Sequence, residues 1–232
     1  MGTIPAHHTP PSSPPDAPEC VVVVTGSAPL HPRAIAAVPP GAYVVAADGG
    51  LDHARAAGLD PDLLVGDLDS ISPVGLAWAV EHAQVERHPA DKTCTDTELA
   101  LALAARRSPS HVLLVAGAGD RLDHALAALG ALGAPSLEQV AEVEGWWGSD
   151  HVRVARPGRP VTLEVAPGTT FSVLAAHGGC DGVTVTGARW PLTDATLGPL
   201  VGLGVSNEAS APSVGVAVAV GIATVLVPGA QP

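Results

Sequence analysis

The sequence predicts an α/β domain with a mostly parallel sheet, followed by an all-β antiparallel sandwich domain. In the first half of the chain, short apolar runs typical of buried strands alternate with runs typical of helices, which is the pattern of parallel βαβ units. In the second half, short strand-like runs are separated by Gly, Pro and Asp, and no convincing helix appears. We therefore expect a leader over 1–19, an α/β domain over 20–145 and a sandwich over 146–232.

The expected strands of the first half are apolar runs that end near Gly or Asp. They are expected over 20–26, 42–50, 62–67 and 111–120. The helices between and after them are expected over 32–38, 51–58, 73–83, 95–107 and 121–132. Ser72 followed by Pro73 has the form of an N-cap and a first helical proline, and Thr95 has the form of another N-cap.

The second half is expected to contribute strands only. They are expected over 151–155, 160–165, 170–176, 181–187 and 213–227. Valines in the last run alternate with Gly and Ala, so we expect one strand there that packs closely on both faces.

Composition excludes several classes of protein. The chain of 232 residues is 47% hydrophobic without a long apolar run, as expected of a soluble globular protein, and its net charge of −12 argues against a nucleic-acid-binding surface. Cys20, Cys94 and Cys180 show no disulfide or metal-ligand spacing. We expect each of them to be a small buried hydrophobe in a reducing compartment, the cytoplasm.

Residues 1–19 are rich in proline and show no apolar periodicity, so we expect a disordered leader. Because this segment lacks the apolar core of a secretory signal, we expect neither a signal peptide nor a membrane anchor.

Two carboxylates stand one residue apart after an expected strand. Asp67 and Asp69 follow the apolar run 63–65 and Gly66. If the chain stays extended past Gly66, residues two apart point to the same side, so both carboxylates face one place. The alternative is a solvated loop in which Asp69 caps a turn.

Other acids are expected at the same edge of the sheet. Asp48 ends the second strand, Asp96 opens a helix, and Asp123 follows a later strand. The carboxyl ends of parallel strands meet at one edge, where ligands bind in such sheets. Each acid alone is more readily structural, but together with Asp67 and Asp69 they predict a site for a hard cation such as Mg²⁺, which prefers carboxylate and phosphate oxygens.

Basic and glycine-rich segments accompany these acids. Lys92 is the chain's single lysine and suits a phosphate, whereas Arg121 suits either a phosphate or a surface salt bridge to Asp120. Gly49-Gly50 and the segment 25–27 suit backbone contacts to phosphate, with ordinary βα turns as the alternative. No Walker A loop or dinucleotide fingerprint is present. The residues alone predict a magnesium-and-phosphate site without specifying a substrate.

Several motifs resemble those of thiamine pyrophosphokinases in order and spacing. In the first half they are ADGG at 47–50, GDLDS at 66–70, TDTELAL at 95–101 and RLDHALA at 121–127. In the second half they are GVTVTGARWPLTDATL at 182–197 and GVSNE at 204–208. The resemblance covers roughly residues 20–228.

The resemblance implies an α/β domain and a β-sandwich domain in a homodimer whose active sites lie between subunits. It implies transfer of the diphosphate of ATP to the hydroxyl of thiamine, giving thiamine diphosphate and AMP. From the net charge and the lack of a long apolar run, we expect neither a nucleic-acid nor a membrane partner.

The resemblance also assigns residues to this reaction. The implied catalytic acids are Asp48, Asp67, Asp69 and Asp96, of which Asp67, Asp69 and Asp96 would hold Mg²⁺ on the ATP phosphates. The implied ATP and phosphate contacts are Gly49, Gly50, Lys92, Thr95, Arg121, Asp123 and His124. The implied thiamine pocket contains Trp190, Ser206 and Asn207. The ring of Trp190 suits a cation–π contact with the thiazolium, and the alternative is a core residue of the sandwich.

The chain departs from the family pattern at two places. Thr93 stands where the family usually carries another acid, which bears on one metal or phosphate contact and on the rate, and Asp120 stands where glycine is common. Two alternatives to a thiamine enzyme stay open. One is a diphosphotransferase for another alcohol such as a pterin, which would differ in the pocket around Trp190 and Asn207, and the other is a nucleotide- or thiamine-binding protein that has lost catalysis, which Thr93 suggests.

Overall fold

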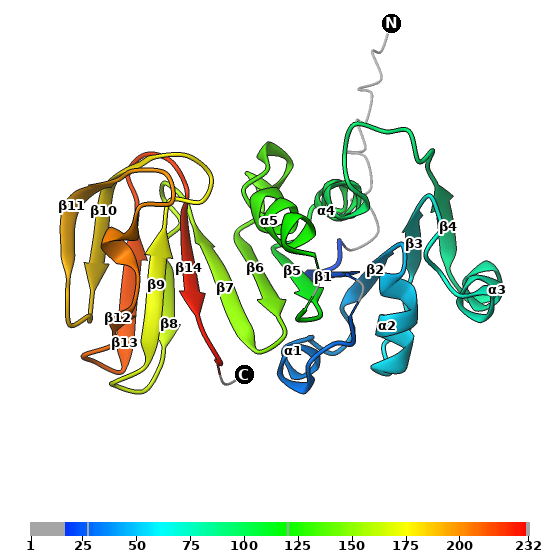
Figure 1. The fold of residues 1–232 in the computed structure, drawn as a ribbon, viewed down its shortest axis with the longest axis horizontal. Helices are drawn as coiled ribbons and strands as arrows, with labels where there is room; N and C mark the ends of the chain where they lie inside the picture. Colours follow the sequence, from blue (N-terminus) through cyan, green and yellow to red (C-terminus); the bar gives the residue numbers. More distant parts are fainter. Residues whose placement is uncertain (1–16, 27, 120, 231–232) are drawn as a thin grey trace, which may run out of the picture.

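The computed structural model describes residues 17–26, 28–119 and 121–230, so residues 1–16 of the leader predicted over 1–19 lie outside the described residues. The chain forms one sheet of ten strands and a second sheet of four strands (Figure 1). Across the ten-stranded sheet the strand order is β12-β9-β14-β7-β6-β5-β1-β2-β3-β4. The four-stranded sheet has the order β11-β10-β13-β8.

The first six strands of the chain form the parallel part of the large sheet. They are β1 (Cys20–Thr25), β2 (Tyr43–Ala47), β3 (Leu63–Gly66), β4 (Gln84–Arg87), β5 (His111–Ala116) and β6 (Glu142–Trp147). The helices are α1 (Pro32–Ala36), α2 (Gly50–Ala56), α3 (Pro73–His82), α4 (Asp96–Arg106) and α5 (Leu122–Ala131), with a 3₁₀ turn, η1 (Pro135–Leu137). This arrangement confirms the predicted α/β class.

The remaining strands are all antiparallel to their neighbours in the sheets. They are β7 (Asp150–Ala155), β8 (Val161–Glu164), β9 (Thr170–Leu174), β10 (Cys180–Thr186), β11 (Leu192–Leu197), β12 (Asn207–Glu208), β13 (Ser213–Ala217) and β14 (Ala223–Val227). A second 3₁₀ turn, η2 (Gly202–Gly204), precedes β12. The predicted sandwich is confirmed.

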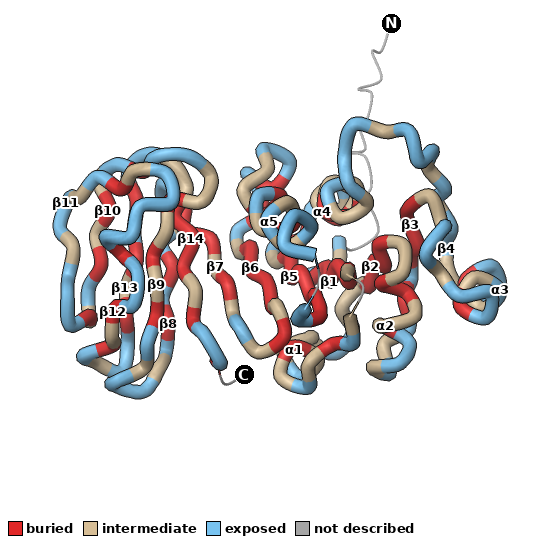
Figure 2. Tube along the Cα trace, in the orientation of Figure 1, coloured by how far each residue is buried: buried red, intermediate tan, exposed pale blue. Residues whose placement is uncertain are grey.

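Apolar side chains on both faces of β1 explain why helices cover both sides of the parallel sheet. Val21 and Val23 pack in one cluster with residues of α4 and α5, whereas Val22 and Val24 pack in another with residues of α1 and α2. Parallel strands buried on both faces have this continuous apolar character. Buried residues accordingly concentrate in the central strands (Figure 2). The second cluster continues into the sandwich through Trp146 and Phe171.

Four strands were not predicted, because their sequences lack a strand pattern. β4 is an exposed, polar edge strand, and β6 carries two glutamates among its apolar residues. β11 is largely polar and β12 has only two residues. Because β6 continues the parallel part and β7 turns back along it, the sheet runs through the predicted boundary at 145–146. The division into domains stays a prediction.

The prediction of a single strand over 213–227 is wrong. The run forms β13 in the small sheet and β14 in the large one. Gly221 between them has φ +86, a left-handed conformation that glycine adopts without strain, and a Cβ there would collide with the carbonyl oxygen of Gly179. Buried residues of both strands belong to one apolar cluster, so the alternating pattern fits two short strands in different sheets as well as one long strand.

The prediction that all three cysteines are buried is wrong for one of them. Cys20 and Cys180 are buried, but Cys94 is exposed in the segment that joins β4 to α4, and all three are free thiols. Within the described residues, no helix is both long and apolar enough to span a membrane.

A buried carboxylate ties together the strands at the centre of the large sheet. Glu144 on β6 lies between His111 on β5, at 3.0 Å, and His151 on β7, at 2.7 Å. Burial alone would raise the pKa of Glu144, but the hydrogen bonds from the two histidines outweigh burial and lower this pKa to about 2. Burial would lower the pKa of His111, but hydrogen bonds with Cys20 and Glu144 raise it to about 10.

We expect this cluster to make stability depend on pH. The contribution of Glu144 is complete above its ordinary pKa of 4.5 and is lost as the pH falls toward about 2. The contribution of His111 is complete below its ordinary pKa of 6.5 and is lost as the pH rises through about 10. Glu144→Gln should therefore lower the free energy of unfolding by about 3 kcal/mol near pH 6 and by less near pH 10. Denaturant titrations at the two pH values measure this difference.

Glu142→Gln, on the same strand, is the matched control. The Glu142 side chain is 43% exposed and pairs with Arg153, so its loss should cost at most about 1 kcal/mol. Equal losses in the two variants, or a loss for Glu144→Gln that is the same at both pH values, would contradict the assignment.

A second prediction concerns the packing of α2 on β1. Gly50 begins α2, and a Cβ there would collide with the carbonyl oxygen of Val24. Gly50→Ala should therefore lower the free energy of unfolding by about 1–3 kcal/mol. Gly130→Ala is the control, because Gly130 lies inside α5 with open space around it, and it should stabilise the protein by about 0.5–1 kcal/mol. Thermal unfolding compares the two, and a neutral Gly50→Ala would contradict the close approach.

Candidate active site at the carboxyl edge of the parallel strands

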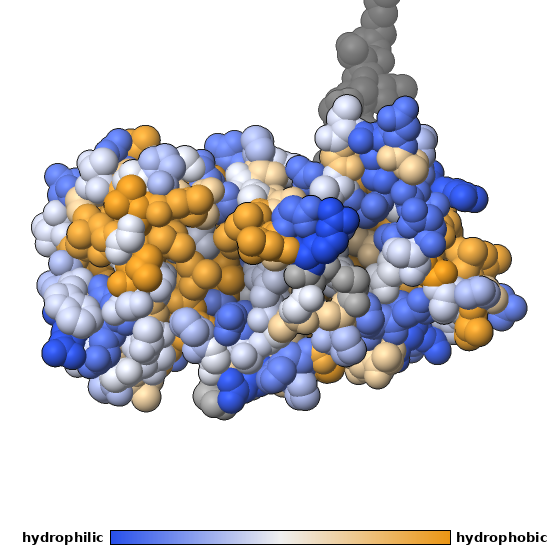
Figure 3. Space-filling view, in the orientation of Figure 1, coloured by the Kyte–Doolittle hydropathy of each residue, from blue (hydrophilic) through white to orange (hydrophobic). Residues whose placement is uncertain are grey.

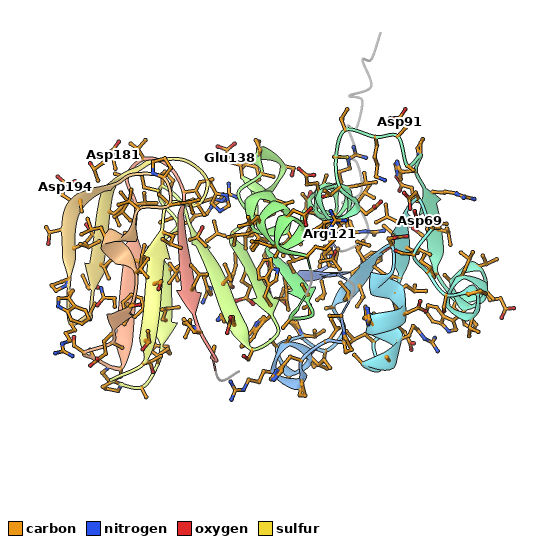
Figure 4. The ribbon with its side chains drawn as sticks, in the orientation of Figure 1. Asp69, Asp91, Arg121, Glu138, Asp181 and Asp194 are labelled. Atoms are coloured by element: carbon orange, nitrogen blue, oxygen red, sulfur yellow. The ribbon has the colours of Figure 1, made fainter. Side chains whose placement is uncertain are left out.

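Three aspartates from neighbouring strand ends come together at one edge of the sheet. Asp48 follows β2, whereas Asp67 and Asp69 follow β3. One carboxylate oxygen from each lies within 4.8 Å of the others. Figure 4 shows Asp69 beside the end of β3. The topology thus gathers three of the predicted acids as expected, because parallel neighbouring strands end on the same side.

The expectation that the chain stays extended past Gly66 is wrong. Strand β3 ends at Gly66, and Leu68 between the two acids has φ +69, which is left-handed. The backbone N–H of Asp69 donates to Asp67 Oδ1 at 3.3 Å. A tight turn, rather than a continued strand, therefore brings the two carboxylates together. The alternative, in which Asp69 caps the turn, does not describe this contact, because the Asp67 carboxylate accepts the N–H of Asp69. The carboxylate of Asp69 lies with those of Asp48 and Asp67.

Gly66 lets the acids approach the end of β3 closely. A Cβ at this position would lie 3.0 Å from Asp96 Oδ1 and 3.1 Å from Asp48 Cβ. Its φ of +149 is also one that other residues rarely adopt. The glycine that the sequence shows as the end of an apolar run is thus part of the site's shape.

Asp48 is held in an uncommon conformation. Its φ is +47, in the left-handed region that few residues other than glycine adopt. The hydroxyl of Ser70 donates to Asp48 Oδ2, whereas Oδ1 is buried and has no hydrogen-bond partner among the residues that the structure describes. Burying a carboxylate oxygen costs free energy unless a cation or a hydrogen-bond donor binds it.

Asp96 opens α4 and pairs with Lys92. The ammonium of Lys92 lies 3.1 Å from Asp96 Oδ1 and 4.0 Å from Asp67 Oδ2. Burial would lower the pKa of Lys92, but the hydrogen bond and charge of Asp96, together with Asp67, raise it on balance. The single lysine of the chain is therefore a charged neighbour of the acids.

The acid group is electrostatically unsatisfied. The negative charge of Asp67 is the largest influence that raises the pKa of Asp69, and burial, Asp48 and Asp96 act in the same direction. A divalent cation would relieve this repulsion and would give the buried Asp48 Oδ1 a partner. Carboxylate oxygens are among the ligands that Mg²⁺ prefers. The residues present therefore fit a magnesium ion. Of the predicted ligands, Asp67 and Asp69 lie in the group with Asp48, whereas Asp96 pairs with Lys92.

The hydroxyl groups at this edge have structural partners. Thr95 caps α4 in a capping box with Glu98, which confirms the predicted N-cap. Thr25 at the end of β1 shares a hydrogen bond of 2.6 Å with Thr97 of α4. Ser27, which belonged to the predicted phosphate segment, lies outside the described residues.

The basic residue that precedes α5 pairs with the first acid of that helix. Arg121 donates to Asp123 at 3.1 Å and 2.6 Å, and this hydrogen bond lowers the pKa of Asp123. The backbone N–H of His124 donates to Asp123 at 3.1 Å. The alternative partner of Arg121, Asp120, lies outside the described residues. Assignment of Arg121, Asp123 and His124 to the nucleotide, like that of Gly49, Gly50 and Thr95, stays a prediction.

The residues predicted for the thiamine pocket meet in the sandwich. Asn207 is buried, accepts from the Trp190 backbone N–H at 3.2 Å and donates to the Trp190 carbonyl at 2.7 Å. Ser206 beside it is left-handed, with φ +57, and its N–H donates to Ser172. The alternative that Trp190 is a core residue is wrong, because it is 54% exposed.

Within one chain, the residues predicted for the thiamine pocket lie far from the group of acids. Asn207 lies on β12 at one end of the ten-stranded sheet, and β3 is eight strands away in the order. At about 4.8 Å per strand, the two groups are on the order of 38 Å apart along the sheet. Asp69 and, on β11, Asp194 likewise lie toward opposite ends of the molecule (Figure 4).

Sequence reasoning missed two contributors to this site. Ser70 binds Asp48, and Thr97 binds Thr25. Ser70 is the last residue of the GDLDS motif, so a hydroxyl directly after two clustered acids was the available signal. Nothing in the sequence indicated Thr97, since its partner is 72 residues away.

Both halves of the chain match family models. The model for the thiamin pyrophosphokinase catalytic domain matches residues 39–142. The model for the thiamin pyrophosphokinase vitamin B1 binding domain matches residues 160–223. No curated protein sequence matches the chain.

Solved structures with similar folds cover nearly the whole chain. Thiamine pyrophosphokinase from Bacillus subtilis has a TM-score of 0.75 at 22% identity, over 90% of this chain and 97% of that chain. A thiamin pyrophosphokinase family protein from Enterococcus faecalis has a TM-score of 0.73 at 24% identity, over 90% and 98%. Thiamin pyrophosphokinase from Candida albicans has a TM-score of 0.73 at 13% identity, over 90% and 89%.

At these identities, the structural similarity establishes the fold, and the two family models, which together match most of the chain, establish the family. With both the catalytic and the vitamin B1 binding domain matched in order, the chain belongs to the thiamin pyrophosphokinases, a family of enzymes.

Proposed function

We propose that the chain transfers the diphosphate group of ATP to the hydroxyl of thiamine, giving thiamine diphosphate and AMP. The observation that carries this proposal is the acid group of Asp48, Asp67 and Asp69 at the carboxyl edge of the sheet, in a chain that matches both domains of the family. We also propose that the enzyme works in the cytoplasm, a reducing compartment that suits its free thiols.

The proposed cofactor is Mg²⁺, held by Asp67 and Asp69 with help from Asp48 and Asp96. When bound, it would neutralise charge on the ATP phosphates and polarise the phosphorus that is attacked. The unpartnered Asp48 Oδ1 and the mutual repulsion of the carboxylates support this cofactor.

The proposed reaction needs no reactant other than ATP and thiamine. The thiamine hydroxyl oxygen forms a bond to the β-phosphorus as the bond from that phosphorus to the oxygen of the α-phosphate breaks. AMP leaves with the electron pair, and the hydroxyl proton passes to a carboxylate or to solvent. Such transfers demand mainly positioning and neutralisation of charge from the protein.

Basic side chains would supply part of that neutralisation. Lys92 lies among the acids, 3.1 Å from Asp96, where its ammonium would also reach phosphate oxygens bound there. Arg121, paired with Asp123 at the beginning of α5, would add a guanidinium on the nucleotide side.

The exposed ring of Trp190 suits the other substrate. A thiazolium cation is attracted to the face of an indole ring. The two hydrogen bonds between Asn207 and the Trp190 backbone fix the segment that carries this ring. Ser206 and Asn207 would line the same pocket.

We further propose a homodimer in which the acids of one subunit meet Trp190 of the other. The separation of the two groups along the sheet, on the order of 38 Å, exceeds what one thiamine molecule spans. Apolar side chains are also exposed over α5 and around η2, on the face shown in Figure 3. They are Leu122, Leu126, Leu200, Leu203, Val201 and Val205. Exposed apolar surface of this kind is typical of subunit contacts.

Incubation of the purified protein with ATP, Mg²⁺ and thiamine tests the reaction. We expect AMP and thiamine diphosphate in equal amounts, and Asp96→Asn should lower the rate by at least about a hundredfold, because it removes a charge from the phosphate site. Chromatography resolves both products, and circular dichroism checks that the variant is folded. Binding of ATP or thiamine without either product would contradict the proposal and favour a protein that has lost catalysis, as Thr93 would suggest. Turnover of another alcohol, such as a pterin, would point to the other alternative.

Mixing two defective variants tests the dimer. Asp69→Asn removes an acid, and Trp190→Ala should raise the KM for thiamine more than the KM for ATP. After co-refolding in equal amounts, half of the dimers carry one intact site if the two residues come from different subunits, so activity at low thiamine should recover to about a quarter of wild type. Two copies of the same variant, refolded in parallel, are the control. No recovery despite dimer formation would place both residues in one subunit.

A further inference from the structure

Asp48 uses its two carboxylate oxygens differently. Oδ2 accepts the hydroxyl of Ser70, whereas Oδ1 is buried without a partner in the described part of the chain. The backbone of Asp48 is fixed on both sides, because its N–H donates to Val65 and its carbonyl accepts from Leu51. With the backbone fixed, the contact with Ser70 decides how the carboxylate is rotated.

Ser70 belongs to the same turn as two of the acids. Asp67 and Asp69 precede it after β3, while Asp48 follows β2, so the hydrogen bond from Ser70 links two adjacent strand ends. The contact is close on the Asp48 side as well. A Cβ at Gly49 would lie 3.2 Å from the Ser70 hydroxyl oxygen and 3.3 Å from its carbonyl oxygen.

Electrostatics explains why such a link is needed. The carboxylates of Asp48, Asp67 and Asp69 repel one another, because one oxygen of each lies within 4.8 Å of the others. A free Asp48 side chain would rotate toward solvent and away from the other two. The Ser70 hydroxyl, which donates to Asp48, opposes that rotation and leaves the second oxygen available.

We propose that Ser70 is a positioning residue that holds the Asp48 carboxylate ready to receive a divalent cation. Ser70 acts through Asp48 and does not itself bind the cation. This inference rests on the cation site of the proposed function. Hydrogen-bond partners of metal-binding side chains commonly change metal affinity by 10–100-fold when they are removed.

The neighbouring Ser72 offers a matched control, because its hydroxyl has a structural role instead. Ser72 caps α3 by accepting from Gly75 at 2.9 Å, and its hydroxyl donates to Asp52 at 2.8 Å. Its removal should lower thermal stability, since loss of an N-cap costs about 1 kcal/mol, without changing cation affinity.

Titration of the whole protein with Mn²⁺, without nucleotide or thiamine, tests the proposal by calorimetry. We expect Ser70→Ala to weaken Mn²⁺ binding by about tenfold at an unchanged Tm, and Ser70→Thr, which keeps the hydroxyl, to restore it to within about threefold of wild type. In turnover assays, the Mg²⁺ concentration for half activation should rise in Ser70→Ala more than kcat falls.

The outcomes separate this proposal from the one it rests on. Wild-type protein that fails to bind Mn²⁺ would overturn the cation site, and the assignment of Ser70 with it. Wild-type binding that Ser70→Ala leaves unchanged would overturn the role of Ser70 alone. Equal losses of Mn²⁺ affinity in Ser70→Ala and Ser72→Ala would show a general disturbance of the segment and would also overturn it.

Discussion

Mutual repulsion of carboxylates at one edge of the sheet is the constraint around which the local structure is arranged. The fold brings three aspartates within 4.8 Å, an arrangement that costs free energy unless positive charge or hydrogen bonds offset it. The chain supplies both. Lys92 lies beside Asp96 and Asp67, and Ser70 holds Asp48. These two residues leave one buried oxygen of Asp48 without a partner among the residues that the structure describes, and this is the oxygen that the proposed cation would bind.

The backbone conformation at the acid group also differs from that of an ordinary sheet edge. Asp48 and Leu68 both have left-handed φ values, which cost free energy for residues other than glycine. The capping box at Thr95 and the N-cap at Ser72 fix the beginnings of the helices on either side. Regular elements thus surround two left-handed residues, one of which belongs to the acid group and the other of which lies between two of its members.

The sequence allowed much of this arrangement to be predicted, for identifiable reasons. The parallel core was predictable because β1, β2, β3 and β5 are short apolar runs that end at Gly or Asp, and parallel topology places their ends together. β4 and β11 were not, because exposed edge strands carry no apolar pattern. The turn at Leu68 was missed because leucine gives no signal for a left-handed φ. The role of Ser70 depends on a residue 22 positions away, which no local pattern reveals.

The continuity of the large sheet limits how the chain can be taken apart. The two family models leave residues 143–159 unassigned, yet this segment holds β7 and all of β6 except its first residue, and the two strands are hydrogen-bonded to each other. A cut between β6 and β7 would strip β6 of a neighbour and leave it an edge strand with unpaired backbone groups, a template for aggregation. The enzyme is therefore not a pair of exchangeable modules. A catalytic half joined to a foreign vitamin-binding half would need to keep this pair of strands intact.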